Sequence, residues 1–286
     1  MKLLIEPITK KENYSDIDGL ILALKDYSVQ SFTYYTLKEI SKIKDNNPDL
    51  EIFVSMNKNF FNEEIDSLKE VLLELDKLKI SGIFFYDLAI LQLKKELNLE
   101  TDLVWSSTHM VNNYKTCNYY YKKGVKYALL GKEITLDEIK EIVQLSDITS
   151  MVEVVGIPTV AFSKRLLITN YYKDLGKQPK NTIEVEEKIT HDTYLLDEDK
   201  NGTSFYLKRV VNGTSIIKDL YDVGTKYIIF RENGIESDLF YDLVSDTKDY
   251  IKGNCLDNAY VEKYKILGDF TNFFFKKTIY KVKKNG

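Results

Sequence analysis

Glu153 is the residue of this chain whose setting points most directly to chemistry. It stands inside the apolar run 151–155, MVEVV, where a carboxylate removed from water needs a cation or a hydrogen-bond donor beside it. Arg165 is the partner that we expect, because an arginine can grip a carboxylate through two parallel hydrogen bonds. Such a pair could be structural, or it could hold a group of a substrate.

Other polar side chains extend this candidate site. Glu133 and His109 join Glu153 as candidate catalytic residues, since His109 could act as an acid, a base or a ligand, or could simply donate a hydrogen bond. The candidates for binding a substrate are Asn57, Asp87, Asn112, Ser163, Arg165 and Arg231. Four carboxylates could together bind a hard divalent cation, although their spacing is not diagnostic: Glu6, Asp87, Glu133 and Glu153.

The elements that would position these residues alternate along the chain. Eight short β-branched or aromatic runs begin at Lys2, Gly19, Glu51, Gly82, Asp102, Lys126, Met151 and Lys226. They are almost continuously apolar, as parallel strands covered on both faces should be. The pattern predicts an α/β fold of the TIM-like (β/α)8 barrel kind. Chemistry in such a barrel belongs at the carboxyl ends of the strands, where the candidate residues stand.

Helical signals separate most of these runs. Apolar residues of the segment 62–78 recur every three or four residues behind an acidic first turn. Thr135 and Glu138 form a capping-box pattern, and Gly124 is placed to end a helix over 112–123. Residues 10–18 leave room for at most a short first helix, so we expect the barrel to be irregular there.

One long interval interrupts the alternation before the last strand. Residues 164–215 are polar and carry turn signals at Gly176, Asn201-Gly202 and Asn212-Gly213, with strand-like sequence between the last two. We therefore expect residues 1–163 and 216–286 to form one barrel domain. Residues 164–215 should form a β-rich excursion over its carboxyl face.

Composition excludes several classes of protein. The 286 residues are 44% hydrophobic, and no apolar run approaches the roughly 18 residues of a membrane helix. The net charge of −4 makes a nucleic-acid partner unexpected unless its binding is local, and the N-terminus lacks a signal-peptide core, so we expect a cytoplasmic protein. Only Cys117 and Cys255 are cysteines, and the HExxH, GxSxG, Walker and GxGxxG motifs are missing.

The segment 153–166 resembles the signature of peptidase family U32, the collagenase-like proteases and their relatives. Four residues stand where that family has them: Glu153, Gly156, Ser163 and Arg165. Thr159 and Leu166 occupy the positions of two family cysteines. The segments 129–139, LLGKEITLDEI, and 106–113, SSTHMVNN, resemble two further motifs, so that the resemblance covers about residues 80–170.

The resemblance implies a peptidase that acts on peptide or protein substrates in the barrel mouth. The sequence offers no assembled nucleophile, so a second interpretation is a degenerate barrel that binds a ligand or a partner protein. A third is a partner subunit in RNA or small-molecule hydroxylation, as in relatives that carry a cysteine-ligated iron–sulfur cluster. Thr159 and Leu166 argue against such a cluster in this chain, and we expect no cofactor.

Overall fold

The computed structural model describes residues 1–107, 110–253, 258–271 and 274–275. Within these ranges, eight parallel strands close into a barrel whose last strand pairs with the first. The strands are β1 (Lys2–Glu6), β2 (Gly19–Leu24), β4 (Glu51–Met56), β5 (Gly82–Phe85), β6 (Leu103–Trp105), β7 (Tyr127–Leu129), β8 (Thr149–Gly156) and β14 (Tyr227–Arg231). Each corresponds to one of the apolar runs of the sequence, so the TIM-like α/β barrel is confirmed.

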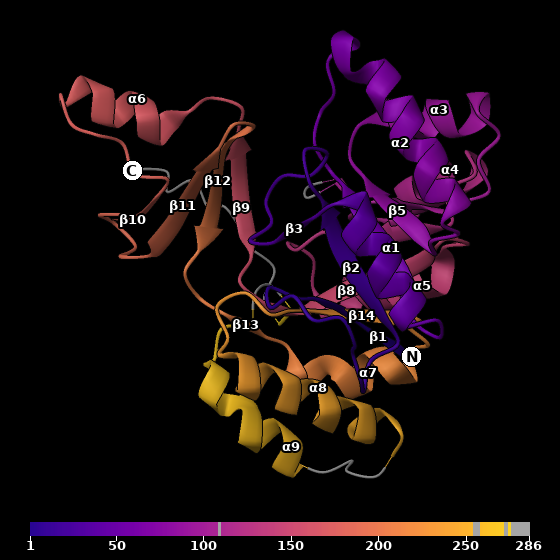
Figure 1. The fold of residues 1–286 in the computed structure, drawn as a ribbon. Coiled ribbons are helices and arrows are strands. Elements are labelled where there is room, and N and C mark those ends of the chain that lie inside the picture. The colour runs from indigo at the N-terminus through magenta and orange to yellow at the C-terminus, as the bar shows by residue number, and fades with distance from the viewer. Residues whose placement is uncertain (108–109, 254–257, 272–273, 276–286) are drawn as a thin grey trace, which may run out of the picture.

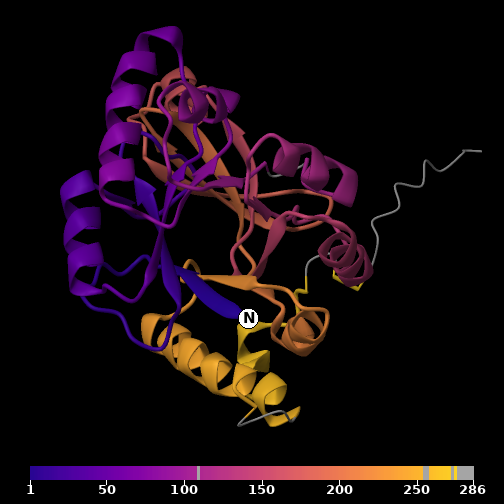
Figure 2. The ribbon, with the colours of Figure 1, turned by 90° about the vertical axis from the view of Figure 1, so that its right-hand side faces the viewer.

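Helices cover the outside of the strands (Figures 1 and 2). They are α1 (Leu37–Asn46), α2 (Ile65–Lys77), α3 (Leu88–Glu96), α4 (Tyr114–Lys122), α5 (Leu136–Leu145), α7 (Ile217–Asp222), α8 (Ser237–Ile251) and α9 (Asn258–Lys263). Three single turns are η1 (Asn62–Glu64), η2 (Thr214–Ile216) and η3 (Tyr264–Leu267), and β3 (Tyr34–Tyr35) extends the sheet beside β2. None of the described helices is long and apolar enough to span a bilayer.

Local sequence signals place these helices as expected. The capping box of α5 is formed, because the Thr135 hydroxyl accepts from the Glu138 backbone N–H and the Glu138 carboxylate accepts from the Thr135 N–H. Gly124 follows α4 with a φ of +89°, the left-handed backbone in which a glycine ends a helix at little cost. Buried Leu68, Leu72 and Leu75 form the apolar stripe of α2.

The connection between β1 and β2 contains no helix. Residues 7–18 instead form an irregular loop that the buried Glu232 carboxylate holds by accepting from the backbone N–H groups of Ile8 at 2.6 Å and Thr9 at 2.9 Å. At the end of the loop, Asp18 pairs with Lys248 of α8 at 2.7 Å. The barrel is therefore irregular at its first helix position, as the short interval predicts.

A separate antiparallel sheet stands beside the barrel (Figure 1). Its strand order is β10 (Thr182–Glu186), β11 (Thr193–Asp199), β12 (Gly202–Leu207) and β9 (Thr159–Ser163), and it is accompanied by α6 (Leu167–Asp174). The sheet thus includes residues 159–163, which precede the polar interval 164–215 of the sequence. β13 (Val211–Asn212) returns the chain to the barrel by pairing with β8.

Candidate functional site

The barrel interior is filled by one apolar layer. A compact cluster of inward-facing side chains comprises Leu4, Ile21, Phe53, Phe84, Val104, Tyr127, Leu129, Met151, Tyr227 and Ile229. The Phe53 ring meets those of Tyr127 and Tyr227 edge to face, although the three residues belong to strands that are not neighbours. These contacts cross the barrel, so the lower interior is a packed core rather than a channel.

The candidate site is the next layer above this core. Side chains alternate along a strand, so the residue two positions after each core residue faces the same interior, closer to the carboxyl end. The rule assigns five residues to this next layer: Glu6, Tyr86, Ser106, Glu153 and Arg231. They follow, in that order, the core residues Leu4, Phe84, Val104, Met151 and Ile229. The barrel mouth is therefore polar and charged, directly above an apolar floor.

Three charged side chains of this layer form a continuous chain of ion pairs with Lys132, which lies in the loop after β7. Arg231 donates through Nε to Glu153 Oε2 at 2.8 Å and through a terminal nitrogen to Glu6. Lys132 lies 3.0 Å from the other oxygen of Glu153. The Glu153 side chain is 7% exposed and that of Arg231 is 17% exposed. Because two cations face two carboxylates, the buried cluster carries no net charge, which limits the cost of its desolvation.

The ion pairs determine the protonation states of the cluster. Burial by itself would raise the pKa of the Glu153 carboxyl, but Arg231 and Lys132 outweigh it and hold that pKa below its ordinary value. Burial acts to lower the pKa of Arg231, yet Glu153 and Glu6 raise it overall. Burial lowers the pKa of Lys132 although Glu153 opposes this. At neutral pH Glu153 is thus a weakly basic carboxylate held by two cations.

Gly156 allows this arrangement. Its φ of +135° lies in the left-handed region, and a Cβ at this position would stand 2.6 Å from Cβ of Arg231 and 2.9 Å from Oδ1 of Asn233. Asn233 fixes the same corner, because its amide accepts from Ile157 N–H at 3.1 Å and donates to Ile157 C=O at 3.0 Å. A glycine is therefore required for β8 and the end of β14 to approach so closely.

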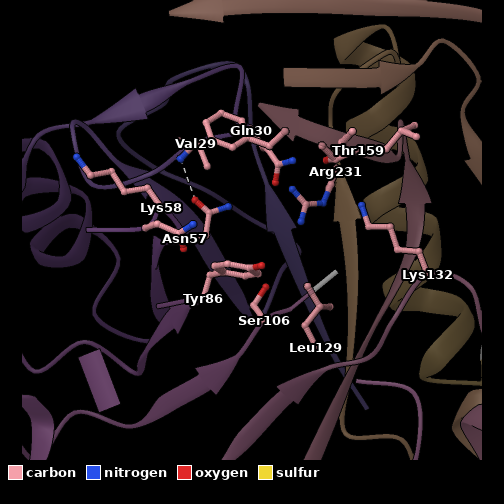
Figure 3. Close-up of a pocket in the computed structure, with 14 residues that line it drawn as sticks. Val29, Gln30, Asn57, Lys58, Tyr86, Ser106, Leu129, Lys132, Thr159 and Arg231 are labelled. Atoms are coloured by element: carbon pink, nitrogen blue, oxygen red, sulfur yellow. Dashed lines mark hydrogen bonds between the residues drawn. The ribbon is translucent and has the colours of Figure 1, made fainter. Parts of the chain in front are cut away.

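A cavity of about 340 Å³ opens above the ion pairs (Figure 3). Its lining comes from the ends of β7 and β14, from the loops after the strands and from β9, and comprises Val29, Gln30, Asn57, Lys58, Asn59, Tyr86, Ser106, Leu129, Lys132, Thr159, Val160, Ala161, Phe162 and Arg231. Three cations, Lys58, Lys132 and Arg231, therefore face the cavity, and no carboxylate is among the described residues that line it. Gln30 has a φ of +61°, a strained backbone for a residue other than glycine.

A second hollow continues from this cavity along the insertion. It has a volume of about 320 Å³ and shares Val29, Lys58, Asn59 and Phe162 with the first. Lys164 stands at its edge, with Nζ 3.8 Å from the centre of the exposed Phe61 ring and 3.3 Å from the Asn59 carbonyl oxygen. We call the two hollows together the mouth groove, which runs between the barrel and β9.

The structure corrects one predicted contact. Glu153 pairs with Arg231 and Lys132, not with Arg165, which is exposed at the start of the insertion. β9 leads the chain away from the barrel before residue 165 is reached, so Arg165 stands apart from the cluster. Ser163, at the end of β9, accepts a hydrogen bond from the Arg165 backbone N–H at 3.2 Å.

The remaining predicted site residues fall into different settings. Asn57 and Arg231 line the cavity, and Asn57 Oδ1 also accepts from Val29 N–H at 2.8 Å. Asp87 caps α3 by accepting from Ala89 N–H at 2.9 Å, and its other oxygen accepts from Phe60 N–H at 2.9 Å. Its carboxylate thus has a structural use in ordering two loops.

The other three predicted residues come from β6 and β7 loops. Glu133 is exposed beside Lys132, and Asn112 packs against Gly131, where a Cβ would stand 2.0 Å from Asn112 Oδ1. His109 lies outside the described residues. Across the described part of the chain, no three His, Cys, Asp or Glu side chains gather closely enough to hold a metal ion. The four carboxylates considered for a cation, Glu6, Asp87, Glu133 and Glu153, therefore do not converge.

Several lining residues could have been found from the strand pattern alone. Tyr86 and Ser106 directly follow the apolar runs that became β5 and β6, at the inward-facing position. Lys132 stands where the resembling family motif has an arginine, so that motif is the signal that points to a cation at this position. Gln30 carries no comparable signal, because its place in the lining depends on the conformation of a long loop.

Comparisons with known proteins found a matching family and several similar proteins. The sequence profile described as Peptidase family U32 matches residues 15–230. The chain is 27% identical to tRNA hydroxylation protein P2 of Bacillus subtilis (strain 168) over 253 residues, which are 80% of this chain and 81% of that protein. It is 22% identical to tRNA hydroxylation protein P1 of the same organism over 157 residues, or 54% of this chain and 37% of P1.

The match to a solved structure, that of the U32 peptidase Mk0906, covers 80% of this chain and 92% of the Mk0906 chain, with 15% sequence identity and a TM-score of 0.48. The profile match extends from the loop before β2 to the last residues of β14, and so includes seven barrel strands and the whole insertion. It also contains Lys132, Glu153 and Arg165. On the strength of that match, the chain belongs to peptidase family U32.

Proposed function

We propose that this protein is a cytoplasmic subunit that takes part in tRNA hydroxylation and holds no iron–sulfur cluster of its own. The observation that carries the proposal is its similarity to tRNA hydroxylation protein P2, which extends over 80% of this chain. The second similar protein bears the same kind of name. Family membership alone would not distinguish this role from proteolysis, because one fold supports many reactions.

The chemistry of the mouth favours binding over proteolysis. Activation of water would need a general base whose pKa lies near neutral pH, whereas Arg231 and Lys132 keep the pKa of Glu153 low. Cys117 is fully buried in α4, and burial raises the pKa of its thiol to about 11, so it is protonated and shielded from any substrate. The charged cluster therefore suits the recognition of polar groups better than the cleavage of a peptide bond.

Thr159 and Leu166, which stand at the positions of two family cysteines, bear on the redox step of the hydroxylation. Thr159 lines the cavity and Leu166 is 38% exposed near the start of α6, and neither side chain can replace the thiolate of a cluster ligand. We accordingly propose that a partner protein supplies the redox chemistry of the hydroxylation, while this chain binds and orients the substrate.

Deletion of the gene in the organism that encodes it tests the proposal. Total tRNA is digested to nucleosides, and hydroxylated nucleosides are quantified by mass spectrometry in the parent, the deletion strain and the strain with the gene restored. We expect the amount of a hydroxylated nucleoside to fall in the deletion strain and to return to the parent level when the gene is restored. Unchanged nucleosides in all three strains would overturn the proposal.

A parallel assay addresses the peptidase interpretation. Purified protein is incubated with unfolded polypeptides, and the products are analysed by mass spectrometry beside those of a Glu153→Gln variant that remains folded. We expect no cleavage above background. Cleavage by the wild type that Glu153→Gln abolishes would instead favour the hydrolase.

A further inference from the structure

The cavity has the size and the mixed lining of a pocket for one nucleobase. Its volume of about 340 Å³ lies in the usual range for small-molecule sites. Tyr86 is 39% exposed at the end of β5 and presents its ring to the cavity (Figure 3). An exposed aromatic ring beside apolar Leu129 and Phe162 can stack against a base of any sequence.

The charged end of the cavity offers donors rather than acceptors. A guanidinium has five N–H donors, and two donor nitrogens of Arg231 meet Glu153 and Glu6. Further N–H groups of Arg231 can therefore reach the cavity, which the residue lines. The carbonyl oxygens of a base are acceptors that match such donors, and Lys132 lies beside Arg231 in the same wall (Figure 3). No carboxylate lines the described cavity to repel an electron-rich base edge.

The rest of the mouth groove suits the chain that would carry that base. Lys58 faces both hollows and is held 2.5 Å from Glu64. Lys164 forms no ion pair within the described part of the chain, although its charge acts on Glu64, which lines the same hollow, and its ammonium group lies over the Phe61 ring. A cation of this kind can exchange its counterion for a backbone phosphate.

From these features we infer that the mouth groove binds an unpaired segment of RNA, with one base inserted beside Tyr86 and Arg231 and a flanking phosphate at Lys164. The inference rests on the proposed function, whose substrate class it refines. The cavity lies below the loops and β9, so a base that remains stacked in a helix could not reach Arg231. A loop or an extruded nucleotide is therefore required.

Binding of labelled oligonucleotides tests the inference. Fluorescence anisotropy is measured with an unstructured single-stranded RNA and with the duplex that this strand forms with its complement, long enough to stay paired in the assay, for the wild type and two pairs of variants. Tyr86→Ala is matched by Tyr119→Ala, whose ring is 58% exposed on α4. Lys164→Ala is matched by Lys77→Ala, whose side chain is 70% exposed at the end of α2.

We expect the single strand to bind more tightly than the duplex. Tyr86→Ala should weaken binding roughly tenfold or more through the loss of one stacked base, and Tyr119→Ala should not. Lys164→Ala should lower the slope of log K against log salt by about 0.7, because one phosphate contact is lost, and Lys77→Ala should leave the slope unchanged. Circular dichroism verifies that all four variants are folded.

Three results would overturn the inference: equal binding of duplex and single strand, an unaltered affinity in Tyr86→Ala, or equal salt slopes for the two lysine variants. None of them bears on whether tRNA hydroxylation in the cell depends on the gene, which the nucleoside analysis measures independently. Loss of hydroxylation together with failed RNA binding would keep the proposed function and reject this site. RNA binding as expected, together with unchanged nucleosides in the deletion strain, would keep this RNA-binding site and reject the role in tRNA hydroxylation.

Discussion

The buried ion pairs make a quantitative prediction for the variant Glu153→Gln. The carboxylate is 7% exposed and contacts Arg231 at 2.8 Å and Lys132 at 3.0 Å. Its neutralisation leaves Arg231 and Lys132 with one carboxylate of the cluster, Glu6, in place of two. Removing one partner of a buried pair costs about 3–5 kcal/mol, because the other charge stays buried without compensation. For 286 residues the entropy of unfolding is roughly 0.6 kcal/mol/K, so that loss lowers Tm by roughly 5–8 °C.

A double-mutant cycle separates this cause from a general packing defect. Lys132→Met alone leaves an excess of negative charge, whereas the double variant Glu153→Gln/Lys132→Met retains the neutral pair of Arg231 and Glu6. The double variant should therefore be more stable than the sum of the two single losses predicts, by about 0.5–3 kcal/mol. Urea unfolding at pH 7, followed by circular dichroism, measures all four proteins.

An exposed pair provides the control. Glu74 and Lys77 lie 2.7 Å apart on α2, with side chains 55% and 70% exposed. Glu74→Gln should change the free energy of unfolding by less than about 1 kcal/mol. The reasoning is refuted if Glu153→Gln is as harmless as Glu74→Gln, or if the losses from Glu153→Gln and Lys132→Met are strictly additive.

Three further predictions concern stability. Since the folded-state pKa of Glu153 lies below its ordinary value of 4.5, its contribution is complete above that value and is lost as the pH falls through the folded pKa. Urea midpoints should thus fall less steeply below pH 4.5 in Glu153→Gln than in the wild type, and parallel curves would contradict this. Gly156→Ala should destabilise the fold by more than about 1 kcal/mol, because its methyl group meets Arg231 in a left-handed backbone; a midpoint equal to that of the wild type would show that β8 can adjust. Thr135→Ala should cost about 1 kcal/mol through loss of the α5 capping box, with Thr135→Ser retaining most of that stability in the same urea assay.

The architecture was largely predictable because barrel signals are local. Each strand is an apolar run, and side-chain hydrogen bonds such as that between Thr135 and Glu138 need only neighbouring residues. The absence of a helix in 7–18 also follows from a local quantity, the length of the interval. A parallel barrel then places all eight carboxyl ends on one face without further information.

The pairing within the site was not predictable in the same way. Arg231 is 78 residues from Glu153 in sequence, and the two meet because β14 pairs with β8 across the insertion. Arg165 looked like the better partner only because it is nearer along the chain. The alternation rule identifies Glu6, Glu153 and Arg231 as inward-facing residues, but only once the packed layer beneath them is known.

The first boundary of the insertion depends on tertiary pairing for a similar reason. Gly156 and Pro158 mark the end of β8 in the sequence, yet nothing local indicates that Thr159 to Ser163 pair with β12 in the second sheet. This pairing brings Thr159 and Phe162 to the mouth groove. Long-range strand pairing of this kind leaves little mark on the residues themselves.

The central claim is that the barrel mouth acts in tRNA hydroxylation, and one measurement tests it most directly. The deletion strain is supplied with the wild-type gene, with Tyr86→Ala or with Tyr119→Ala at equal protein levels, and hydroxylated tRNA nucleosides are quantified by mass spectrometry. The account predicts that the wild type and Tyr119→Ala restore the modification and that Tyr86→Ala restores little of it. Full restoration by Tyr86→Ala would contradict the claim that the mouth is the site.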